Sequence, residues 1–120
     1  MVQNLSPKLK KINLGTFYFK DTEEHIKILV ERCNQLKELH MECSVPITDS
    51  AITIIIEGLK NTLETLDLYP CEEISNSKLA ELRLMPKLQY LSIRKNRRRI
   101  EVIRRIEMVG NSSGFGYVLM

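Results

Sequence analysis

The cysteines and histidines are the residues most able to do chemistry, because thiolate and imidazole groups bind metals or act as nucleophile and base. His40 and Cys43 are separated by two residues, a spacing typical of zinc ligands. A tetrahedral zinc site needs four converging donors, however, and in the stacked repeats described below His40 would face the open strand surface while Cys33, Cys43 and Cys71 would sit at turns. No third group that would orient a Cys–His catalytic pair can be identified. We therefore expect no metal site and no catalytic residue, and we interpret the cysteines as small buried side chains.

Two pairs of adjacent carboxylates, Glu23-Glu24 and Glu72-Glu73, are the candidates for acid–base chemistry. Neighbouring residues at a turn or helix start do not face each other across a cleft, so we expect them to favour a helix N-terminus through its dipole. Neither a GxxxxGK[ST] nor a GxGxxG phosphate-binding motif is present. The sequence therefore predicts a protein that is not an enzyme and has no cofactor and no small-molecule substrate.

A run of positive charge lies between residues 94 and 105, where seven basic residues stand against a single Glu101. The whole chain has a net charge of +3, so the remainder is slightly acidic, unlike a dedicated nucleic-acid binder. We interpret the run as the solvated face of a helix; the alternatives are a surface for an acidic partner or RNA, or a localisation signal. The basic residues in question are Arg97, Arg98, Arg99, Arg104 and Arg105.

The elements that position these groups follow from an internal repeat. A segment of the form Leu-x-x-Leu-x-Leu, with Ile or Met in place of some leucines, occurs four times, with first leucines at 9, 36, 63 and 88. The spacings of 27, 27 and 25 residues lie within the about 20–29 residues of a leucine-rich repeat. Side chains alternate between the faces of a strand, so each copy would bury aliphatic residues on one side only. One such strand is too small to fold alone, and stacked parallel copies would share a core.

The residues between the copies must return the chain to the next strand, and their apolar residues recur at helical spacing. Capping residues such as Thr48 and Ser75 precede two of these stretches. The tail from Gly110 to Met120 is rich in apolar residues and is expected to form a fifth strand or a cap. The predicted helices cover 22–32, 50–59, 76–84 and 97–109.

In two segments within roughly residues 6–96 a cysteine follows the strand and precedes the start of a helix: Leu68-x-x-Cys71-x-x-Ile74-Ser75-Asn76, and Cys43 followed by Ile47-Thr48-Asp49. With these segments the repeats resemble the cysteine-containing class of leucine-rich repeats, which is best known from the F-box/leucine-rich-repeat proteins. Cys43 falls one place earlier relative to its strand than Cys71 does, so its turn must differ. The resemblance implies an α/β leucine-rich-repeat solenoid spanning residues 1–120 as one domain: a short, curved, right-handed stack of parallel strands with outer helices.

The resemblance also implies a function: a non-enzymatic protein–protein interaction module that recognises the substrate of an SCF-type ubiquitin ligase. Its partner would then be a protein that becomes ubiquitinated. No F-box is found, since nothing before Ser6 could hold one, so we expect the repeat half alone. The alternative is an assembly or scaffold factor of the same repeat class without a role in ubiquitin transfer.

Stacked repeats predict which residues a partner would contact, because corresponding positions line up in columns on the concave side. Tyrosine is favoured at interface anchors, although a plain solvated face is the alternative. The first column would be Lys11, Glu38, Thr65 and Tyr90; the second Asn13, His40, Asp67 and Ser92; the third Gly15, Glu42, Tyr69 and Arg94.

Composition places the chain among soluble proteins with a packed core, because 43% of its residues are hydrophobic and 28% are charged. No apolar stretch approaches the ~20 residues of a membrane span, and the first residues lack the pattern of a signal peptide. Three cysteines are too few for a disulfide framework. We expect a cytoplasmic or nuclear protein with no membrane partner, and nucleic acid is not expected as its main ligand.

Overall fold

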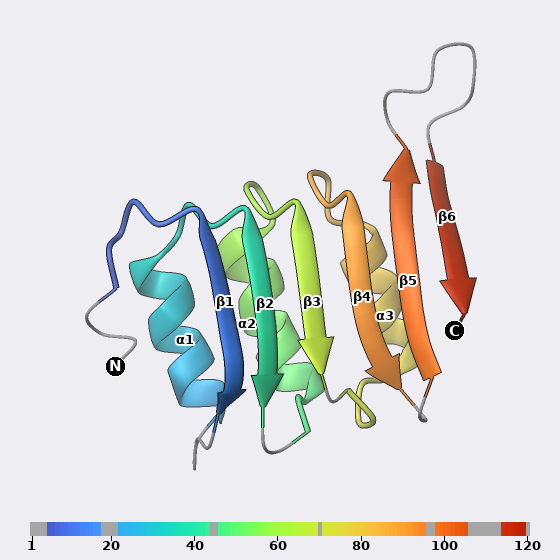
Figure 1. Ribbon diagram of the computed structural model, residues 1–120, viewed down its shortest axis with the longest axis horizontal. Helices are drawn as coiled ribbons and strands as arrows, with labels where there is room; N and C mark the ends of the chain where they lie inside the picture. Colours follow the sequence, from blue (N-terminus) through green and yellow to red (C-terminus); the bar gives the residue numbers. More distant parts are fainter. Residues whose placement is uncertain are drawn as a thin grey trace.

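Strands and helices of the chain form two layers in the computed structural model, which describes residues 5–17, 22–43, 46–69, 71–95, 98–105 and 114–119 (Figure 1). In chain order the elements are β1 (Lys11–Phe17), α1 (Thr22–Arg32), β2 (Glu38–Cys43), α2 (Asp49–Leu59), β3 (Thr65–Tyr69), α3 (Asn76–Arg83), β4 (Tyr90–Lys95), β5 (Arg98–Arg105) and β6 (Gly114–Leu119).

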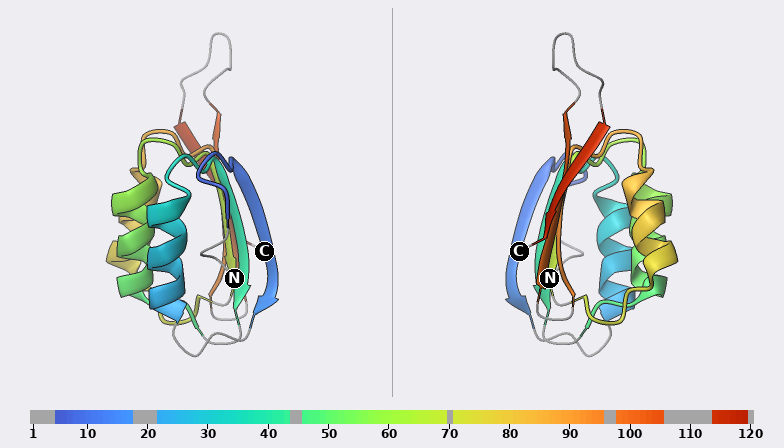
Figure 2. Two further views of the ribbon diagram at one scale, coloured as in Figure 1. Left: turned by 90° about the vertical axis from the view of Figure 1, so that its left-hand side faces the viewer. Right: turned by 90° about the vertical axis from the view of Figure 1, so that its right-hand side faces the viewer.

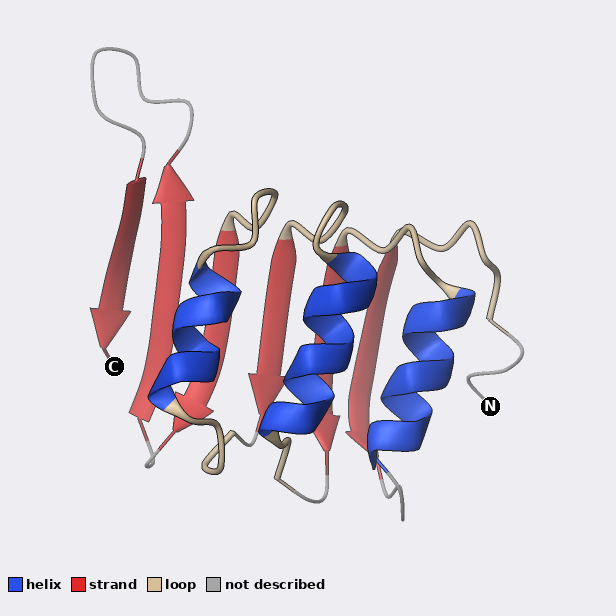
Figure 3. Ribbon diagram, turned by 180° about the vertical axis from the view of Figure 1, so that it is seen from behind, coloured by secondary structure: helices blue, strands red, loops and turns tan. Residues whose placement is uncertain are grey.

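The sheet follows the order of the sequence, β1-β2-β3-β4-β5-β6. The first four strands are parallel and alternate with the three helices, whereas β5 and β6 are antiparallel to their neighbours. All three helices lie on the same side of the sheet, as the edge-on views in Figure 2 and the rear view in Figure 3 show. The α/β class and the four parallel strands of the sequence analysis are therefore confirmed.

The core lies between the sheet and the helices and is built from the repeated leucines. The first leucines of the second, third and fourth copies, Leu36, Leu63 and Leu88, are completely buried. In the first copy Ile12 retains 9% exposure and Leu14 is half-buried. The first copy is less buried because β1 lies at the edge of the sheet and has a neighbouring strand on one side only.

Side-chain caps begin two of the helices and also connect neighbouring repeats. The Thr48 hydroxyl accepts a hydrogen bond from the Ala51 N–H at the start of α2 and donates one to Glu23 Oε1 in α1, 2.9 Å away. Ser75 caps α3 in the same way, and its N–H donates to Asp49 Oδ1 over 2.9 Å. Each cap therefore satisfies exposed helix N–H groups and fixes one helix start against the previous one.

The predicted helix bounds hold closely for the first three helices. The helix predicted over 22–32 is confirmed as α1, α2 begins one residue earlier than expected, and α3 ends one residue earlier. Glu23 and Glu24 stand in the first turn of α1, where the helix dipole favours them. The caps expected from Thr48 and Ser75 are present.

The fourth predicted helix, over 97–109, is wrong: residues 98–105 form β5, antiparallel to β4. Isoleucines three residues apart suit a helix, but β-branched residues also suit a strand, and the outer edge of β4 offers backbone hydrogen-bonding groups that a strand can pair. Arg97 and residues 106–109 lie outside the described residues. The arginines on β5 therefore do not form a helix face.

The third predicted column also needs a correction. Glu42 in β2 stands opposite Thr16 and not Gly15, because the register of β1 shifts between Leu14 and Thr16. Such a shift inserts one extra residue into a strand, and glycine is common at these irregularities. The first two columns keep the predicted register on all four strands.

Two further predictions, a fifth strand or cap in the tail and the absence of a membrane span, can be checked only in the described residues. Within the tail, residues 114–119 form β6 against β5, and the rest of residues 110–120 is not described. The helices in the described part of the chain contain 11, 11 and 8 residues, and none is long and apolar enough to cross a bilayer.

Candidate functional site

The side of β1–β4 opposite the helices, called here the strand face, carries a hollow of about 410 Å³. It lies over the middle and carboxyl ends of the parallel strands, because its residues come from the second and third predicted columns and from the strand positions between them. The residues that line it are Asn13, Leu14, Gly15, His40, Met41, Glu42, Asp67, Leu68, Tyr69, Ser92, Ile93 and Arg94.

Polar residues reach this face because alternate residues of each strand are committed to the core. Leu39 in β2 is fully buried and Met41 is 4% exposed, so the residues between and beside them point to the other side. The same alternation holds in β3, where Leu66 and Leu68 are buried and Asp67 is half-buried. The leucine period that builds the core therefore also places the polar columns.

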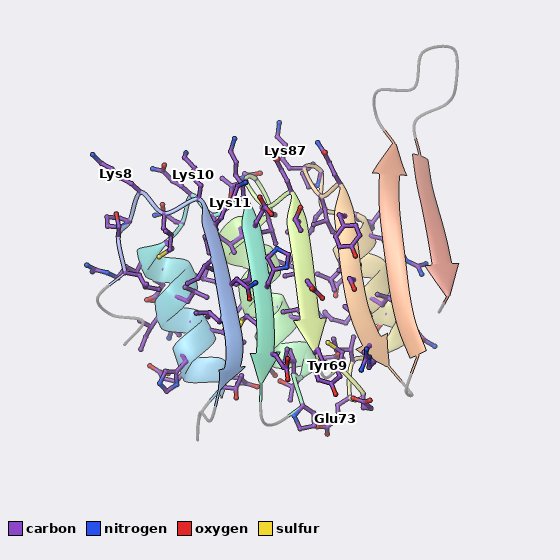
Figure 4. The ribbon with its side chains drawn as sticks, in the orientation of Figure 1. Lys8, Lys10, Lys11, Tyr69, Glu73 and Lys87 are labelled. Carbon is purple, nitrogen blue, oxygen red and sulfur yellow. The ribbon has the colours of Figure 1, made fainter. Side chains whose placement is uncertain are left out.

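The first column begins with an ion pair between Lys11 Nζ and Glu38 Oε2 at 2.9 Å. The hydrogen bond from Lys11 lowers the pKa of the Glu38 carboxyl, and the same hydrogen bond raises the pKa of Lys11. This pair joins β1 to β2 at the amino ends of the strands, where Figure 4 also shows Lys8, Lys10 and Lys87. The first column therefore stands between these lysines and the hollow.

His40 lies between two carboxylates at the centre of the strand face. Its Nδ1 is 3.4 Å from Asp67 Oδ2 on β3, and its Nε2 is 3.6 Å from Glu38 Oε1 on its own strand. The row continues to Ser92 on β4, so a histidine, an aspartate and a serine follow one another across the sheet. In a catalytic triad the histidine stands between the serine and the aspartate, whereas here Asp67 stands between His40 and Ser92. The row therefore lacks the order that passes a serine proton to histidine.

The carboxyl end of the hollow is formed by a stacked pair. The Arg94 guanidinium lies 4.7 Å from the centre of the Tyr69 ring, within the range of a cation–π contact. Both side chains are exposed, and Tyr69 stands at the lower end of β3 in Figure 4. A guanidinium held over an aromatic face can still donate hydrogen bonds from the N–H groups at its edge.

The predicted contact residues divide into two groups. Asn13, His40, Glu42, Asp67, Tyr69, Ser92 and Arg94 line the hollow, and Lys11, Glu38, Thr65 and Tyr90 form the row beyond its amino-terminal side. Ser92 is only 1% exposed, so it contributes to the floor and not to the accessible surface. Gly15 lines the hollow as well, and the space where a Cβ would stand is open.

Sequence reasoning missed two features of this face. It did not foresee the stacking of Arg94 on Tyr69, although both were assigned to the same column. It also missed that Arg94 and Lys95 stand opposite Arg99 and Arg98, because the segment that contains β5 was predicted to be helical. The signal that could have found this pairing is the strand propensity of Ile100, Val102 and Ile103.

Cys33 and Cys71 lie away from the hollow, whereas Arg94, the first residue of the basic run, lines it. Cys33 and Cys71 are completely buried, as expected, and burial raises the pKa of the Cys33 thiol. Within the part of the chain that the structure describes, no three His, Cys, Asp or Glu side chains meet in a way that could hold a metal ion. The side chains of Cys43 and of Arg98, Arg99, Arg104 and Arg105 are not described, and Arg97 lies outside the described residues.

Comparisons of this chain with protein-family models, with curated proteins and with solved structures find no match.

Proposed function

We propose that this chain is a non-enzymatic protein-binding module and that its partner lies on the strand face. The observation that carries the proposal is the alignment of two polar columns across four parallel strands, next to a hollow of about 410 Å³. The opposite side of the sheet is covered by helices, so the strand face is where the repeats present aligned, accessible side chains (Figure 2). Stacked repeats commonly bind partners on such a surface.

We further propose that the parallel part of the fold is a short leucine-rich-repeat solenoid. A recurring backbone contact supports this view. The carbonyls of Lys10, Lys37 and Glu64, which lie just before β1, β2 and β3, each accept hydrogen bonds from two N–H groups at the start of the strand in the next repeat. The buried leucines also recur at the repeat spacing of the sequence. Each repeat is thus attached to the next by the same contacts, which is the pattern expected of stacked units.

The charges of the strand face favour a protein as the partner. Glu38, Glu42 and Asp67 place three carboxylates on two neighbouring strands, and a nucleic-acid backbone laid across them would be repelled. A polypeptide can match acidic and basic positions with side chains of either sign. Tyr69 adds an exposed aromatic ring of the kind that anchors protein interfaces.

A role in recognising the substrate of a ubiquitin ligase is the more specific form of this proposal, and its support is the cysteine-type repeat pattern around Cys71 and Cys43. An assembly or scaffold factor would use the same face. The two are separated by affinity capture from cells: recovery of ligase subunits with this chain supports the ligase role, and recovery of a stable complex without them supports the scaffold.

The strand-face proposal is tested by quantitative affinity capture with mass spectrometry. The variant Tyr69→Ala/Tyr90→Ala removes two aromatic rings from the predicted columns, and we expect it to lose partners that the wild-type chain retains. The control is Leu84→Ala, which truncates a side chain that is 77% exposed just after α3 and away from the strand face. Equal recovery of every partner by the wild type and both variants would contradict the proposal.

A further inference from the structure

Three exposed side chains form a row across the carboxyl ends of β2, β3 and β4, with opposite charges on either side of one tyrosine. Glu42 stands opposite Tyr69, and the Arg94 guanidinium lies 4.7 Å from the centre of the Tyr69 ring. The residue before each of them along its strand is buried, so strand alternation directs all three to the strand face, where they line the hollow. Glu42, Tyr69 and Arg94 are called here the dipolar row.

The acidic side of the dipolar row is reinforced by Asp67, which also lines the hollow. Asp67 is half-buried, and its Oδ2 lies 3.4 Å from His40 Nδ1, so part of its hydrogen-bonding capacity is used within the protein. Glu42 is exposed and stands at the next strand-face position towards the carboxyl ends of the strands. A basic side chain that approached β2 and β3 would therefore pair with Glu42 and be attracted by Asp67 as well.

The basic side of the dipolar row is suited to a carboxylate. Among the described residues, no carboxylate lies within ion-pair distance of the Arg94 guanidinium. A guanidinium stacked on an aromatic ring can donate two parallel N–H···O hydrogen bonds to a carboxylate. Because the contact with Tyr69 already orders this long side chain, a ligand that binds it loses less conformational entropy.

The distance between the two charges indicates which ligands can reach both. Neighbouring strands lie about 4.8 Å apart, so the Cα atoms of Glu42 and Arg94, two strands apart, are separated by about 10 Å. In an extended peptide, residues two positions apart point to the same side and lie about 7 Å apart, and the long side chains of both partners can span the difference. A free amino acid carries both charges on one Cα, too close together to reach both.

We propose that the strand face binds an extended segment of a partner protein in which a basic and an acidic residue stand two positions apart, the basic side chain on Glu42 and the acidic side chain on Arg94. This inference rests on the proposed function, because it names the chemistry of the partner for the same face. A peptide of one sign, or a nucleic-acid backbone, would pair with one side of the dipolar row and be repelled by the other.

The test is fluorescence anisotropy at low salt with the full chain and three labelled peptides of about eight residues, long enough in extended form to cross β1–β4. The mixed peptide repeats Lys-Ser-Glu-Ser, and the two single-sign peptides repeat Lys-Ser or Glu-Ser, so all three carry equal numbers of charged residues. Their ends are blocked to remove the terminal charges. We expect the mixed peptide to bind the wild type at least about threefold more tightly than either single-sign peptide.

Two variants examine the two sides of the dipolar row separately. Arg94→Gln and Glu42→Gln should each weaken the mixed peptide about threefold or more. Arg94→Gln should also strengthen the Lys-Ser peptide, and Glu42→Gln the Glu-Ser peptide, because each removes a repulsion; a variant that had lost its fold would gain neither. The controls Lys60→Gln and Glu57→Gln remove the same charges at exposed positions of the α2 region, on the helix side, and should change affinity by less than about 1.5-fold.

The role of Tyr69 is checked with a matched pair of substitutions. Tyr69→Phe keeps an aromatic ring under the guanidinium and should retain the affinity for the mixed peptide, whereas Tyr69→Leu removes the ring and should weaken it. Equal affinity of both variants would show that the stacking does not position Arg94.

Several outcomes would overturn the inference. These are no binding of the mixed peptide by the wild type, equal or tighter binding of a single-sign peptide, and equal losses in the variants and their controls. Tighter binding of a single-stranded RNA of eight nucleotides would overturn the assignment to a peptide. The proposed function is decided separately by the tyrosine variant in affinity capture: if that variant loses partners while the mixed peptide fails to bind, the strand face binds a protein of a different charge pattern.

Discussion

Gly58 allows α1 and α2 to approach closely, and its replacement by alanine is the sharpest test of how the helix layer is packed. A Cβ added at Gly58 would overlap Cγ1 of Val30, a residue of α1 that is only 5% exposed. A β-branched side chain in a helix has one strongly preferred rotamer, so Val30 cannot simply rotate away. The two helices, or the Val30 side chain, must move to accept the new methyl group.

Two opposing terms set the size of the effect. Alanine is favoured over glycine in a helix interior by about 1 kcal/mol, whereas forcing an extra methyl group into a packed contact costs about 1–3 kcal/mol. We therefore expect Gly58→Ala to lower the free energy of unfolding by about 1 kcal/mol, measured by urea denaturation followed by circular dichroism. The control Glu57→Ala, at an exposed neighbouring position in α2, should change it by less than about 0.5 kcal/mol.

The cause is isolated by a second substitution. Val30→Ala alone should cost about 2 kcal/mol from lost burial, but in that background Gly58→Ala should become neutral or stabilising, because the overlap is gone and the helix preference remains. The coupling between the two sites should be about 1–2 kcal/mol. If Gly58→Ala stabilises the protein by about 1 kcal/mol when Val30 is present, the close approach of the helices is refuted.

Three further predictions concern an ion pair, a thiol and a helix cap. The pKa of Glu38 is lowered, so its ion pair with Lys11 stabilises the fold above pH 4.5, the ordinary Glu value, and this stabilisation is lost as pH falls through the lower folded pKa. The pKa of Lys11 is raised, so the same stabilisation is fully present below pH 10.5, the ordinary Lys value, and is lost as pH rises through the higher folded pKa. The difference in urea midpoint between the wild type and Lys11→Met should therefore be constant between these limits and vanish beyond both, and a difference independent of pH would contradict it. Cys33 is fully buried and its pKa is raised, so iodoacetamide at about pH 8 should modify it far more slowly in the native protein than in urea; equal rates, read by peptide mass spectrometry, would count against its burial. Ser75→Ala removes the acceptor for the Lys78 N–H and should cost about 1 kcal/mol of unfolding free energy, whereas Ser75→Asp should retain most of it; a neutral alanine variant would show that the cap does not stabilise α3.

The parallel part of the fold could be predicted from the sequence because several local signals agree there. The leucine period gives the core face of each strand, and residues such as Thr48 and Ser75 mark where helices begin. If parallel strands pair at a constant repeat spacing, His40 must stand opposite Asp67 and Glu38 opposite Thr65, and the structure has both pairs. Consistency between local pattern and global repeat is what makes such a prediction dependable.

The candidate site could be predicted only as positions. Which residues share a column follows from the strand register, but the stacking of Arg94 on Tyr69 depends on side-chain rotamers that no spacing specifies. The register shift at Gly15 likewise depends on how β1 pairs with β2, and the sequence of β1 alone does not specify it. The burial of Ser92 follows from its packing environment and not from its place in a polar column.

The segment that forms β5 was predicted wrongly because its local pattern is ambiguous and the deciding interaction is distant. Ile100 and Ile103 fit one face of a helix, and Ile100 and Val102 fit one face of a strand equally well. In the structure β4 has an outer edge to which β5 adds, and each added pair satisfies backbone groups that a separate helix would leave open. Whether a short apolar stretch of this kind forms a helix or a strand therefore depends on the element against which it packs.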